Sequence, residues 1–489
     1  MAQSTQPPAP AARDHSPADV FDRLRDQAEQ RLRQFRAGPI TPLAAYTLEK
    51  DLRALLDTAG RDLLQQVFNR LEPDAKDQAD AKVRYRGQTY RRNKKTRASV
   101  ATCFGPLTLW SWLYLAAEDG EPGLHPLHVR LGIGAGGATT ALAERVARRA
   151  VDDSQRQLRQ WLAAEHGLRW SNDRLRRVLA DFRRTAVAFR AEAQQDRLLS
   201  WLEQAERSRG RHRPVLAAGR DGVMVPIRGQ QFQEASAATV SVYDRRGRRL
   251  GTVYLGQMPQ ARQTALTDEL TALVTEVLRR WPGGPPRLVY VTDKGQAQTD
   301  YYRRVLRRMA DPRRPGRRLV WEWVLDYFHV CGYVGQLREA LFGAGGQRWL
   351  LRMRQWLQRR RQGVPQVLRS AMQHRLRQKR SRAARAAFWK AYRYLRRHRR
   401  WMDYARYRRL GVPIGSGVTE AACKTVFTQR LKRSGMRWHK ESGQVIVDLR
   451  VLQLSGIWDE VVRRDLQSRV LPERGSHQPA TQRTRRKTA

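Results

Sequence analysis

The chain is poor in acidic residues, in cysteine and in long apolar runs, and each shortage excludes a class of protein. Its 489 residues hold 46 Asp and Glu against 94 Lys and Arg, a formal net charge of +48. Such a surface favours nucleic acid as the partner, ahead of an anionic membrane surface. The three cysteines form no CxxC pair, which argues against a disulfide framework and fits a reducing cytosol. No stretch approaches the roughly 20 apolar residues of a membrane span, and no signal peptide is expected.

A chain of this length exceeds what one core supports, so we expect several domains. Shifts in composition and apolar period set their bounds. The expected segments are, in chain order, a disordered tail at 1–17, a helical N-terminal region at 18–95, a β-ribbon with a Pro/Gly linker at 96–137, a second helical region at 138–212, the first part of an α/β core at 213–345, a basic helical insertion at 346–412, the end of the core at 413–465 and a basic tail at 466–489.

A glycine separates two amphipathic helical segments in the second helical region. The first spans about 153–165 and ends before Gly167, and Ser171 or Asn172 can cap the second, at 172–185. The second helix turns an apolar stripe inward and these arginines outward: Arg174, Arg176, Arg177, Arg183 and Arg184. This outline is typical of a helix-turn-helix, although plain helical hairpins share it. It predicts that Arg174, Arg176 and Arg177 reach the major groove of duplex DNA.

Beyond about residue 213 the apolar period changes from 3.6 to 2, which predicts strands. Three strand patterns form an expected antiparallel meander, and the first of them contains Asp221. Two buried apolar runs follow, alternating with helices, and end at Asp293 and Asp326. The expected fold is therefore a mixed α/β sheet, with these aspartates at the edge where the parallel strands end.

Carboxylates gathered at one edge of a sheet suit a hard divalent cation. Mg²⁺ prefers carboxylate oxygens and takes phosphate as a further ligand, and a pair of such ions promotes phosphodiester cleavage. In so basic a chain, the pattern indicates a metal site that acts on a polyanion. The plainer alternatives are that Asp326 is a turn or helix cap, and that Glu420 and Lys424 form an ordinary i,i+4 pair.

The order of the motifs resembles that of the DDE transposases of bacterial insertion sequences, and most closely the Kra-type family. The matching pieces are Asp221-Gly, Asp293-Lys-Gly, Asp326-Tyr-Phe-His329, a long helical insertion and the GSGVTEAACK segment around Glu420. The resemblance covers roughly residues 85–460. It implies an RNase H-like core with a helical insertion, Mg²⁺ or Mn²⁺ as cofactor, and a homo-oligomer on DNA in a prokaryotic cytoplasm, associated with the nucleoid and not with a membrane. The ribbon lacks the cysteine pair of many members, so no zinc site is expected there.

The resemblance assigns Asp221, Asp293 and Glu420 as the catalytic, metal-binding acids, with Asp326 and His329 accessory to them. Asp326 competes with Asp293 for the place of the second acid. Further DNA contacts are expected from the basic insertion and the segment after Glu420: Arg396, Arg397, Arg399, Arg400, Lys424, Arg430, Arg437 and Trp438. A core role for Trp438 stays open.

The implied function is that of a transposase, which binds double-stranded DNA at the element ends and at the target and catalyses strand cleavage and transfer. Two alternatives from other classes stay open. One is a domesticated DNA-binding protein that does not cleave, and the other is an RNase H-like nuclease without strand transfer.

Overall fold

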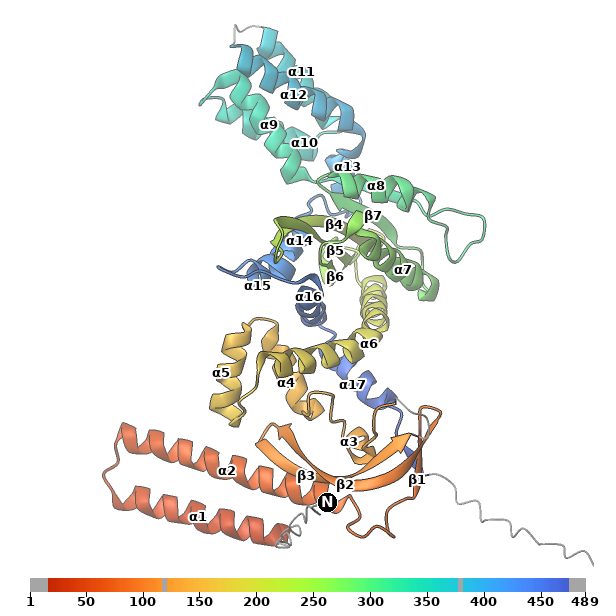
Figure 1. Cartoon of the computed structure of the whole chain (residues 1–489). Helices are drawn as coiled ribbons and strands as arrows, with labels where there is room; N and C mark the ends of the chain where they lie inside the picture. The colour runs from red at the N-terminus through yellow and green to blue at the C-terminus, as the bar shows by residue number, and fades with distance from the viewer. Residues whose placement is uncertain (1–15, 117–120, 377–380, 475–489) are drawn as a thin grey trace, which may run out of the picture. The chain divides into compact units, whose positions relative to one another are not determined.

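The computed structural model describes residues 16–116, 121–376 and 381–474 (Figure 1). The chain forms two compact units, one of residues 1–182 with 466–489 and one of residues 183–465. Residues 1–15 of the expected disordered tail lie outside the described residues. Residues 475–489 of the expected basic tail do so as well. Within the described residues, no helix is both long enough and apolar enough to cross a membrane.

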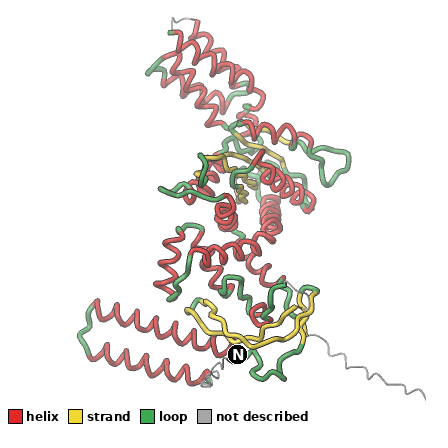
Figure 2. Tube along the Cα trace, viewed as in Figure 1, coloured by secondary structure: helices red, strands yellow, loops and turns green. Residues whose placement is uncertain are grey.

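The first unit joins a helical hairpin to a small antiparallel sheet (Figure 2). The hairpin is α1 (Pro17–Ala37) and α2 (Pro42–Arg70), and the sheet has the strand order β3-β2-β1-β9. Its strands are β1 (Lys82–Tyr85), β2 (Gln88–Thr102), β3 (Gly105–Ala116) and β9 (Glu473–Arg474). Three helices follow β3 in the chain: α3 (Pro126–Arg130), α4 (Thr140–Ala150) and α5 (Gln155–His166).

Two sequence expectations are wrong in this unit. Residues 82–95 were expected to be helical but form β1 and the start of β2. A shift in the β2–β3 register between Arg92 and Lys94 breaks the alternation of side chains, so the period of two is not visible there. The tail was expected from residue 466, yet α17 (Trp458–Ser468) continues past it and β9 pairs with β1.

The second unit is built on a mixed five-stranded sheet of order β6-β5-β4-β7-β8, which confirms the expected α/β class. The strands β4 (Val215–Pro226), β5 (Phe232–Tyr243) and β6 (Arg249–Gln257) form the antiparallel meander. β7 (Arg287–Thr292) lies parallel to β4, and β8 (Trp321–Leu325) lies parallel to β7.

Alternate residues of the central strands fill a core on each face of this sheet. Leu216 and Tyr290 pack with residues of α6 (Asn172–Arg207) and α7 (Thr264–Arg280). Ala217 and Val289 pack on the opposite face, with α9 (Tyr327–Phe342). Because both faces are covered, the runs before Asp293 and Asp326 are apolar except for Thr292 and Glu322, and this is why the sequence showed them.

The helical insertion extends the core that begins on α9. It contains α10 (Gln347–Arg359), α11 (Gly363–Leu376), α12 (Arg382–His398), the short turn η3 (Arg399–Trp401) and α13 (Tyr404–Arg409). Figure 1 shows α10, α11 and α12 bundled with α9. The apolar side chains of the insertion, such as Met353, Phe388 and Leu395, are buried in this bundle. The chain then returns to the sheet through α14 (Gly417–Ala422), the π-helical turn η4 (Cys423–Thr428), α15 (Gln429–Leu431) and α16 (Lys440–Leu454).

The helix α6 is much longer than the sequence pattern predicted. It runs for 36 residues, from Asn172 to Arg207, where a helix over 172–185 was expected. The segment contains no Gly or Pro, so nothing local ends it at residue 185. The two compact units consequently divide inside α6, between Phe182 and Arg183, rather than near residue 212.

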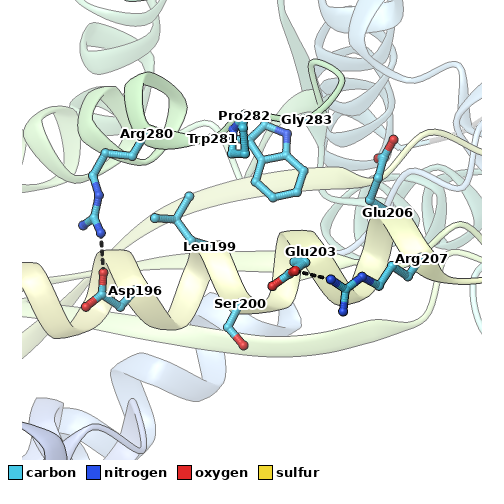
Figure 3. Close-up of a pocket in the computed structure, with 10 residues that line it drawn as sticks. All are labelled: Asp196, Leu199, Ser200, Glu203, Glu206, Arg207, Arg280, Trp281, Pro282 and Gly283. Carbon is cyan, nitrogen blue, oxygen red and sulfur yellow. Dashed lines mark hydrogen bonds and ion pairs between the residues drawn. The ribbon is translucent and has the colours of Figure 1, made fainter.

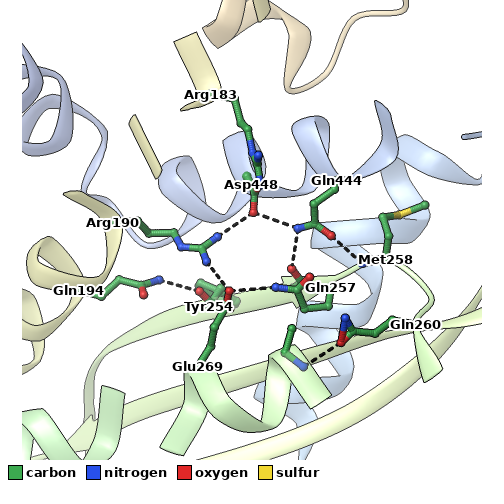
Figure 4. Close-up of polar contacts among 12 residues, drawn as sticks. Arg183, Arg190, Gln194, Tyr254, Gln257, Met258, Gln260, Glu269, Gln444 and Asp448 are labelled. Carbon is green, nitrogen blue, oxygen red and sulfur yellow. Dashed lines mark hydrogen bonds and ion pairs between the residues drawn. The ribbon is translucent and has the colours of Figure 1, made fainter. Parts of the chain in front are cut away.

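A buried polar network ties α6 to α7 and α16 in the second unit (Figure 4). Asp448 is only 1% exposed and accepts hydrogen bonds from Arg183 and Arg190, both at 2.7 Å, and from Gln444 at 2.9 Å. Arg190 also donates to Glu269 of α7 at 2.8 Å. Arg183 was expected on the outer face of its helix; the structure corrects this, because its guanidinium is paired with the buried carboxylate of Asp448.

Replacing Asp448 by Asn should destabilise the second unit strongly. The substitution preserves shape but removes the charge that compensates the buried Arg190, and breaking a buried ion pair costs about 3 kcal/mol or more. Urea unfolding measures the loss. The matched control is Glu203→Gln, which breaks an exposed ion pair with Arg207 within α6, the helix that also bears Arg190. It should lower the free energy of unfolding by no more than about 1 kcal/mol. Equal effects of the two substitutions would contradict this interpretation.

Candidate functional site

Two of the predicted acids lie just beyond the parallel pairing of β4 with β7. Ala218 of β4 pairs with Tyr290 of β7, and Asp221 and Asp293 lie three residues beyond this pair. Neighbouring strands are about 4.8 Å apart, so the register brings the two aspartates to one edge of the sheet. Both side chains are half-buried.

The third aspartate extends the row by one strand. Thr292 of β7 pairs with Leu325 of β8, and Asp293 and Asp326 are the residues that follow this pair. Asp326, unlike the other two, is fully buried. Asp293 and Asp326 therefore lie at the carboxyl ends of two neighbouring parallel strands, while Asp221 lies within β4, beyond the part of it that pairs with β7.

The environment of Asp221, including the other acids of the site, raises its pKa. Burial raises its pKa to about 6, and the charges of Asp293 and Glu420 push in the same direction. Hydrogen bonds from the Gly222 amide, at 2.8 Å, and from the Cys423 thiol, at 3.6 Å, oppose the rise. The charges of Asp293 and Glu420 therefore act on Asp221, and these are the three acids that the resemblance assigned.

Asp326 is the N-cap of α9, and both of its carboxylate oxygens accept hydrogen bonds from within the protein. One carboxylate oxygen accepts from the backbone amide of His329 at 2.6 Å. The other accepts from the amide of Ser416 and, at 2.9 Å, from its hydroxyl. Asp326 thus fixes the loop before α14, which favours Asp293 as the second acid of the row.

The hydroxyl of Ser416 contacts the carboxylates of both Asp326 and Glu420. The hydroxyl oxygen lies 2.7 Å from Oε1 of Glu420 as well as 2.9 Å from Asp326. A hydroxyl has one proton, so it donates to one of the two carboxylates at a time. Glu420 itself is exposed at the start of a short helix, and its contact with Ser416 orients its carboxylate.

The helix that bears Glu420 lies against β4 because Gly219 has no side chain. A Cβ atom at residue 219 would lie 2.1 Å from Oγ1 of Thr419, which is closer than atoms approach. The same Thr419 hydroxyl lies 2.8 Å from that of Thr239 on β5 in a buried contact. Packing of α14 on the sheet therefore fixes the position of Glu420 relative to Asp221.

Two residues near Asp221 were missed in the sequence analysis. Cys423 begins the π-helical turn after α14 and contacts Asp221; such turns often accompany functional sites. Glu234 of β5 lies over Gly222, since a Cβ there would come within 1.8 Å of its Oε1. Neither has a local sequence signal, because each depends on pairing between distant segments.

The loop that follows β7 connects the acids to the insertion. Asp293 accepts from the Gly295 amide at 3.0 Å, and Lys294 between them has a positive φ of 74°. The Lys294 ammonium lies 4.2 Å from the ring centroid of Trp401 and touches His398. Burial lowers the pKa of Lys294 to about 8, and the nearby charges of Arg397, Arg303 and Arg400 add to the effect.

The donor set of the site fits a hard divalent cation. Asp221, Asp293 and Glu420 offer only oxygen atoms, which suit Mg²⁺ or Mn²⁺. In the part of the chain that the structure describes, no three or more His, Cys, Asp or Glu side chains are already arranged to hold an ion. The acids are nevertheless close enough for Asp293 and Glu420 to raise the pKa of Asp221, and a cation between them would offset that repulsion.

The structure corrects the expectation that Arg174 reads DNA. Its guanidinium donates to the carbonyls of Gly136 and Gly137, at 2.9 and 3.2 Å, and lies 5.0 Å from the ring centroid of Trp170. The side chain therefore holds a loop of its own unit. Arg176 and Arg177 are exposed, and Arg176 pairs with Asp173 one helical turn away.

The segment after Glu420 divides into buried and exposed basic residues. Arg430 is 2% exposed and lies 5.1 Å from the ring centroid of Trp438, so the expected DNA contact by Arg430 is wrong. Trp438 is half-buried and its indole donates to the Leu431 carbonyl at 2.9 Å, which favours the core role that stayed open. Lys424 and Arg437 are exposed, as DNA contacts require.

His329 and the insertion arginines lie on the surface. The His329 ring is exposed and packs edge-on against Tyr333, with the centroids 5.4 Å apart. Its backbone amide, rather than its ring, makes the contact with Asp326. The four predicted insertion residues are all exposed, near the end of α12 and on η3: Arg396, Arg397, Arg399 and Arg400.

A surface groove of about 530 Å³ lies elsewhere in the second unit, between α6 and the end of α7 (Figure 3). It contains none of the predicted site residues. Three acids, Asp196, Glu203 and Glu206, line it, and Asp196 is paired with Arg280 there. Arg207 also lines the groove and pairs with Glu203, so much of the charge in this lining is already paired, and the candidate site is the edge of the sheet that bears the predicted acids.

No known protein family model matches the chain, and no curated protein matches it. The function is therefore inferred from the chemistry of the acidic edge and of the basic surface beside it.

Gly219→Ala should displace α14 and destabilise the fold. Overpacking of this kind typically costs about 1–3 kcal/mol. Adding Thr419→Ala removes the oxygen that the new methyl group meets, so the double variant should lose less stability than the two single variants summed. Gly417→Ala on the same helix is the control, because a Cβ there meets nothing within 4 Å. Additive losses in urea unfolding would contradict the proposed contact.

Asp221→Asn should stabilise the metal-free protein at neutral pH. Folded Asp221 keeps its proton up to about pH 6, while an ordinary Asp releases it near 3.8, so its ionisation destabilises the fold as the pH rises through this window. The gain should be about 1–2 kcal/mol at pH 7–8, after allowing for partial exposure.

The measurement is urea unfolding in EDTA between pH 4 and 8, and the control is Asp244→Asn. Burial opposes ionisation of Asp244, but the amides of Arg248 and Arg246 outweigh it and lower its pKa. Its substitution should therefore destabilise at neutral pH, opposite in sign to Asp221→Asn. A destabilised Asp221→Asn protein would refute the raised pKa assigned to Asp221.

Proposed function

We propose that the chain is a DDE-type transposase that binds insertion-sequence ends and catalyses metal-dependent DNA strand cleavage and strand transfer. The observation that carries the proposal is the position of Asp221 and Asp293 just beyond the pairing of two parallel strands, with Asp221 also in contact with Cys423, three residues after Glu420. Asp221, Asp293 and Glu420 are the acids that the motif order assigned. The net charge of +48 supports DNA as the substrate.

The architecture of the second unit supports an RNase H-like core. Three antiparallel strands are followed by two parallel strands with helices between them. A basic helical insertion separates the last strand from the helix that bears Glu420. The resemblance to DDE transposases implies this arrangement, in which the chain returns to the sheet to supply the third acid.

In the proposed mechanism, Asp221, Asp293 and Glu420 hold Mg²⁺ or Mn²⁺. Such ions, when bound, activate a water or hydroxyl nucleophile and stabilise charge on the leaving oxygen of a phosphodiester. Asp221 has to be ionised to bind a cation, so its raised pKa predicts weaker binding below about pH 6. Asp326 acts through Ser416 by holding the loop before α14, which aims Glu420 at the edge.

The insertion is proposed to contribute a sequence-independent grip on DNA. Its apolar side chains are buried, while Arg396, Arg397, Arg399 and Arg400 are exposed. Exposed guanidinium groups neutralise phosphates and release counterions, whatever the base sequence. Recognition of the element ends is assigned to the first unit, with Arg176 and Arg177 as the candidate readers. A homo-oligomer on DNA, in a prokaryotic cytoplasm, completes the proposal.

Alanine substitution of Asp221, Asp293 or Glu420 should abolish cleavage and leave DNA binding intact, because only the transition-state interaction is lost. Cleavage and joining of a labelled duplex carrying the element's end, with Mg²⁺, provide the measurement. Asp326→Asn is the contrast: it acts by positioning, so it should retain reduced cleavage, together with lower thermal stability.

Three outcomes would contradict the proposal or narrow it. Near-wild-type cleavage by Asp293→Ala would transfer the role of second acid to Asp326. Cleavage that persists in excess EDTA would exclude the metal mechanism. Cleavage without strand joining would favour a nuclease, and DNA binding without cleavage would favour a non-cleaving DNA-binding protein.

A further inference from the structure

Four basic side chains from separate parts of the fold gather beside Asp293. Lys294 lies in the loop after β7, and Arg303 lies on α8 (Gln296–Arg304). Arg397 of α12 and Arg400 of η3 come from the insertion. Lys294 contacts the ring of His398, the residue that follows Arg397. Arg303 follows Tyr302, whose ring centroid lies 4.3 Å from that of Trp323, and Trp323 in turn contacts Trp401. The cluster therefore spans the core and the insertion, next to a proposed catalytic acid.

An aromatic ring holds two of these cations together. The Lys294 ammonium lies 4.2 Å from the ring centroid of Trp401, and the Arg400 guanidinium carbon lies 4.0 Å from it. Trp401 in turn packs on the buried Trp323 of β8, with the centroids 4.7 Å apart. Cation–π contacts fix both charges without neutralising either.

The positive charges of the cluster are not paired with carboxylates. Among the residues that the structure describes, none of the four basic side chains forms an ion pair with Asp or Glu. The Lys294 ammonium instead contacts the ring of His398, with Nε2 3.1 Å away, and a neutral imidazole leaves its charge in place. Like charges held this close repel one another, and an anion between them would offset the repulsion.

The backbone around Lys294 also favours an anion. Its φ of 74° is a left-handed conformation that non-glycine residues seldom adopt, and such strain is concentrated at functional sites. The next residue, Gly295, is the N-cap of α8, whose first turn has neither an acidic residue nor a side-chain cap. The N-terminal amides of that helix add positive potential beside the cluster.

We propose that Lys294, Arg303, Arg397 and Arg400, assembled on Trp401, form a phosphate-binding site for the DNA backbone next to the phosphodiester at the acidic edge. The inference deepens the proposed function and rests on it for the identity of the polyanion. The site gives the insertion a specific task, because the DNA strand that reaches Asp293 also has to contact α12 and η3. Arg397 and Arg400 are then part of substrate positioning, and not only of a diffuse basic surface.

The test compares the salt dependence of DNA binding by full-length variants. Binding of a labelled random-sequence duplex is measured by fluorescence anisotropy in EDTA, from low to moderate salt. Lys294→Gln should reduce the slope of log K against log salt by about one unit, and Lys294→Gln with Arg400→Gln by about two. At 0.1 M salt, each lost contact should weaken binding about five- to tenfold.

Matched controls separate a site from a general loss of charge. Arg279→Gln removes one charge from the exposed surface of α7, where Arg279 pairs with Glu276, and should leave the slope unchanged. Lys294→Arg preserves the charge and should preserve most of the slope. If Lys294→Gln fails to fold, judged by circular dichroism, Arg400→Gln alone tests the site, because Arg400 is exposed.

The outcomes distinguish this inference from the proposed function. An unchanged slope in the double variant, with DNA binding and cleavage by the wild type intact, overturns the phosphate site alone. A reduced slope in the double variant supports the site even if Asp293→Ala cleaves normally, a result that would overturn the catalytic assignment. Absence of DNA binding by the wild type overturns both.

Discussion

Charge held partly out of water, beside charge of the same sign, is the constraint on which the candidate site depends. Burial raises the pKa of Asp221 to about 6, and the charges of Asp293 and Glu420 add to the rise. Three features hold these acids. Asp221 and Asp293 lie just beyond the parallel pairing of β4 with β7, the missing side chain of Gly219 lets α14 approach β4, and the buried Asp326 fixes the loop before α14 through Ser416.

A few residues away, basic side chains rather than acids are held close to one another. Lys294, Arg397 and Arg400 repel one another beside Asp293 and are held by Trp401 and by the packing of the insertion. Each cluster destabilises the unliganded fold, and each would be relieved by a ligand of the opposite charge. Sites of this kind commonly trade stability for function. The apolar cores on both faces of the sheet and the Arg190–Asp448 network supply stability elsewhere in the unit.

How much the sequence could predict depended on whether the signal was local. The runs before Asp293 and Asp326 are apolar because both faces of the sheet are covered, so the mixed sheet and its acidic edge were predictable. The exposure of the insertion arginines followed from their number, since so many guanidinium groups cannot all be buried. Arg174 and Arg430 were misjudged because charge does not reveal a carbonyl or an indole brought near by tertiary folding. Cys423, Glu234 and Ser416 were missed for the same reason, and a bulge hid the strand character of residues near Arg92.

The place of Glu420 in the chain has a consequence for synthesis on the ribosome. Roughly 200 residues separate it from Asp221, which corresponds to about 10–40 s of translation at ordinary elongation rates. During that interval the meander and the parallel strands can form, but α14 has not emerged to pack on Gly219. The nascent chain therefore carries two of its three acids without the third. Under the proposed function, the order of the polypeptide itself would keep DNA cleavage from starting before the second unit is complete.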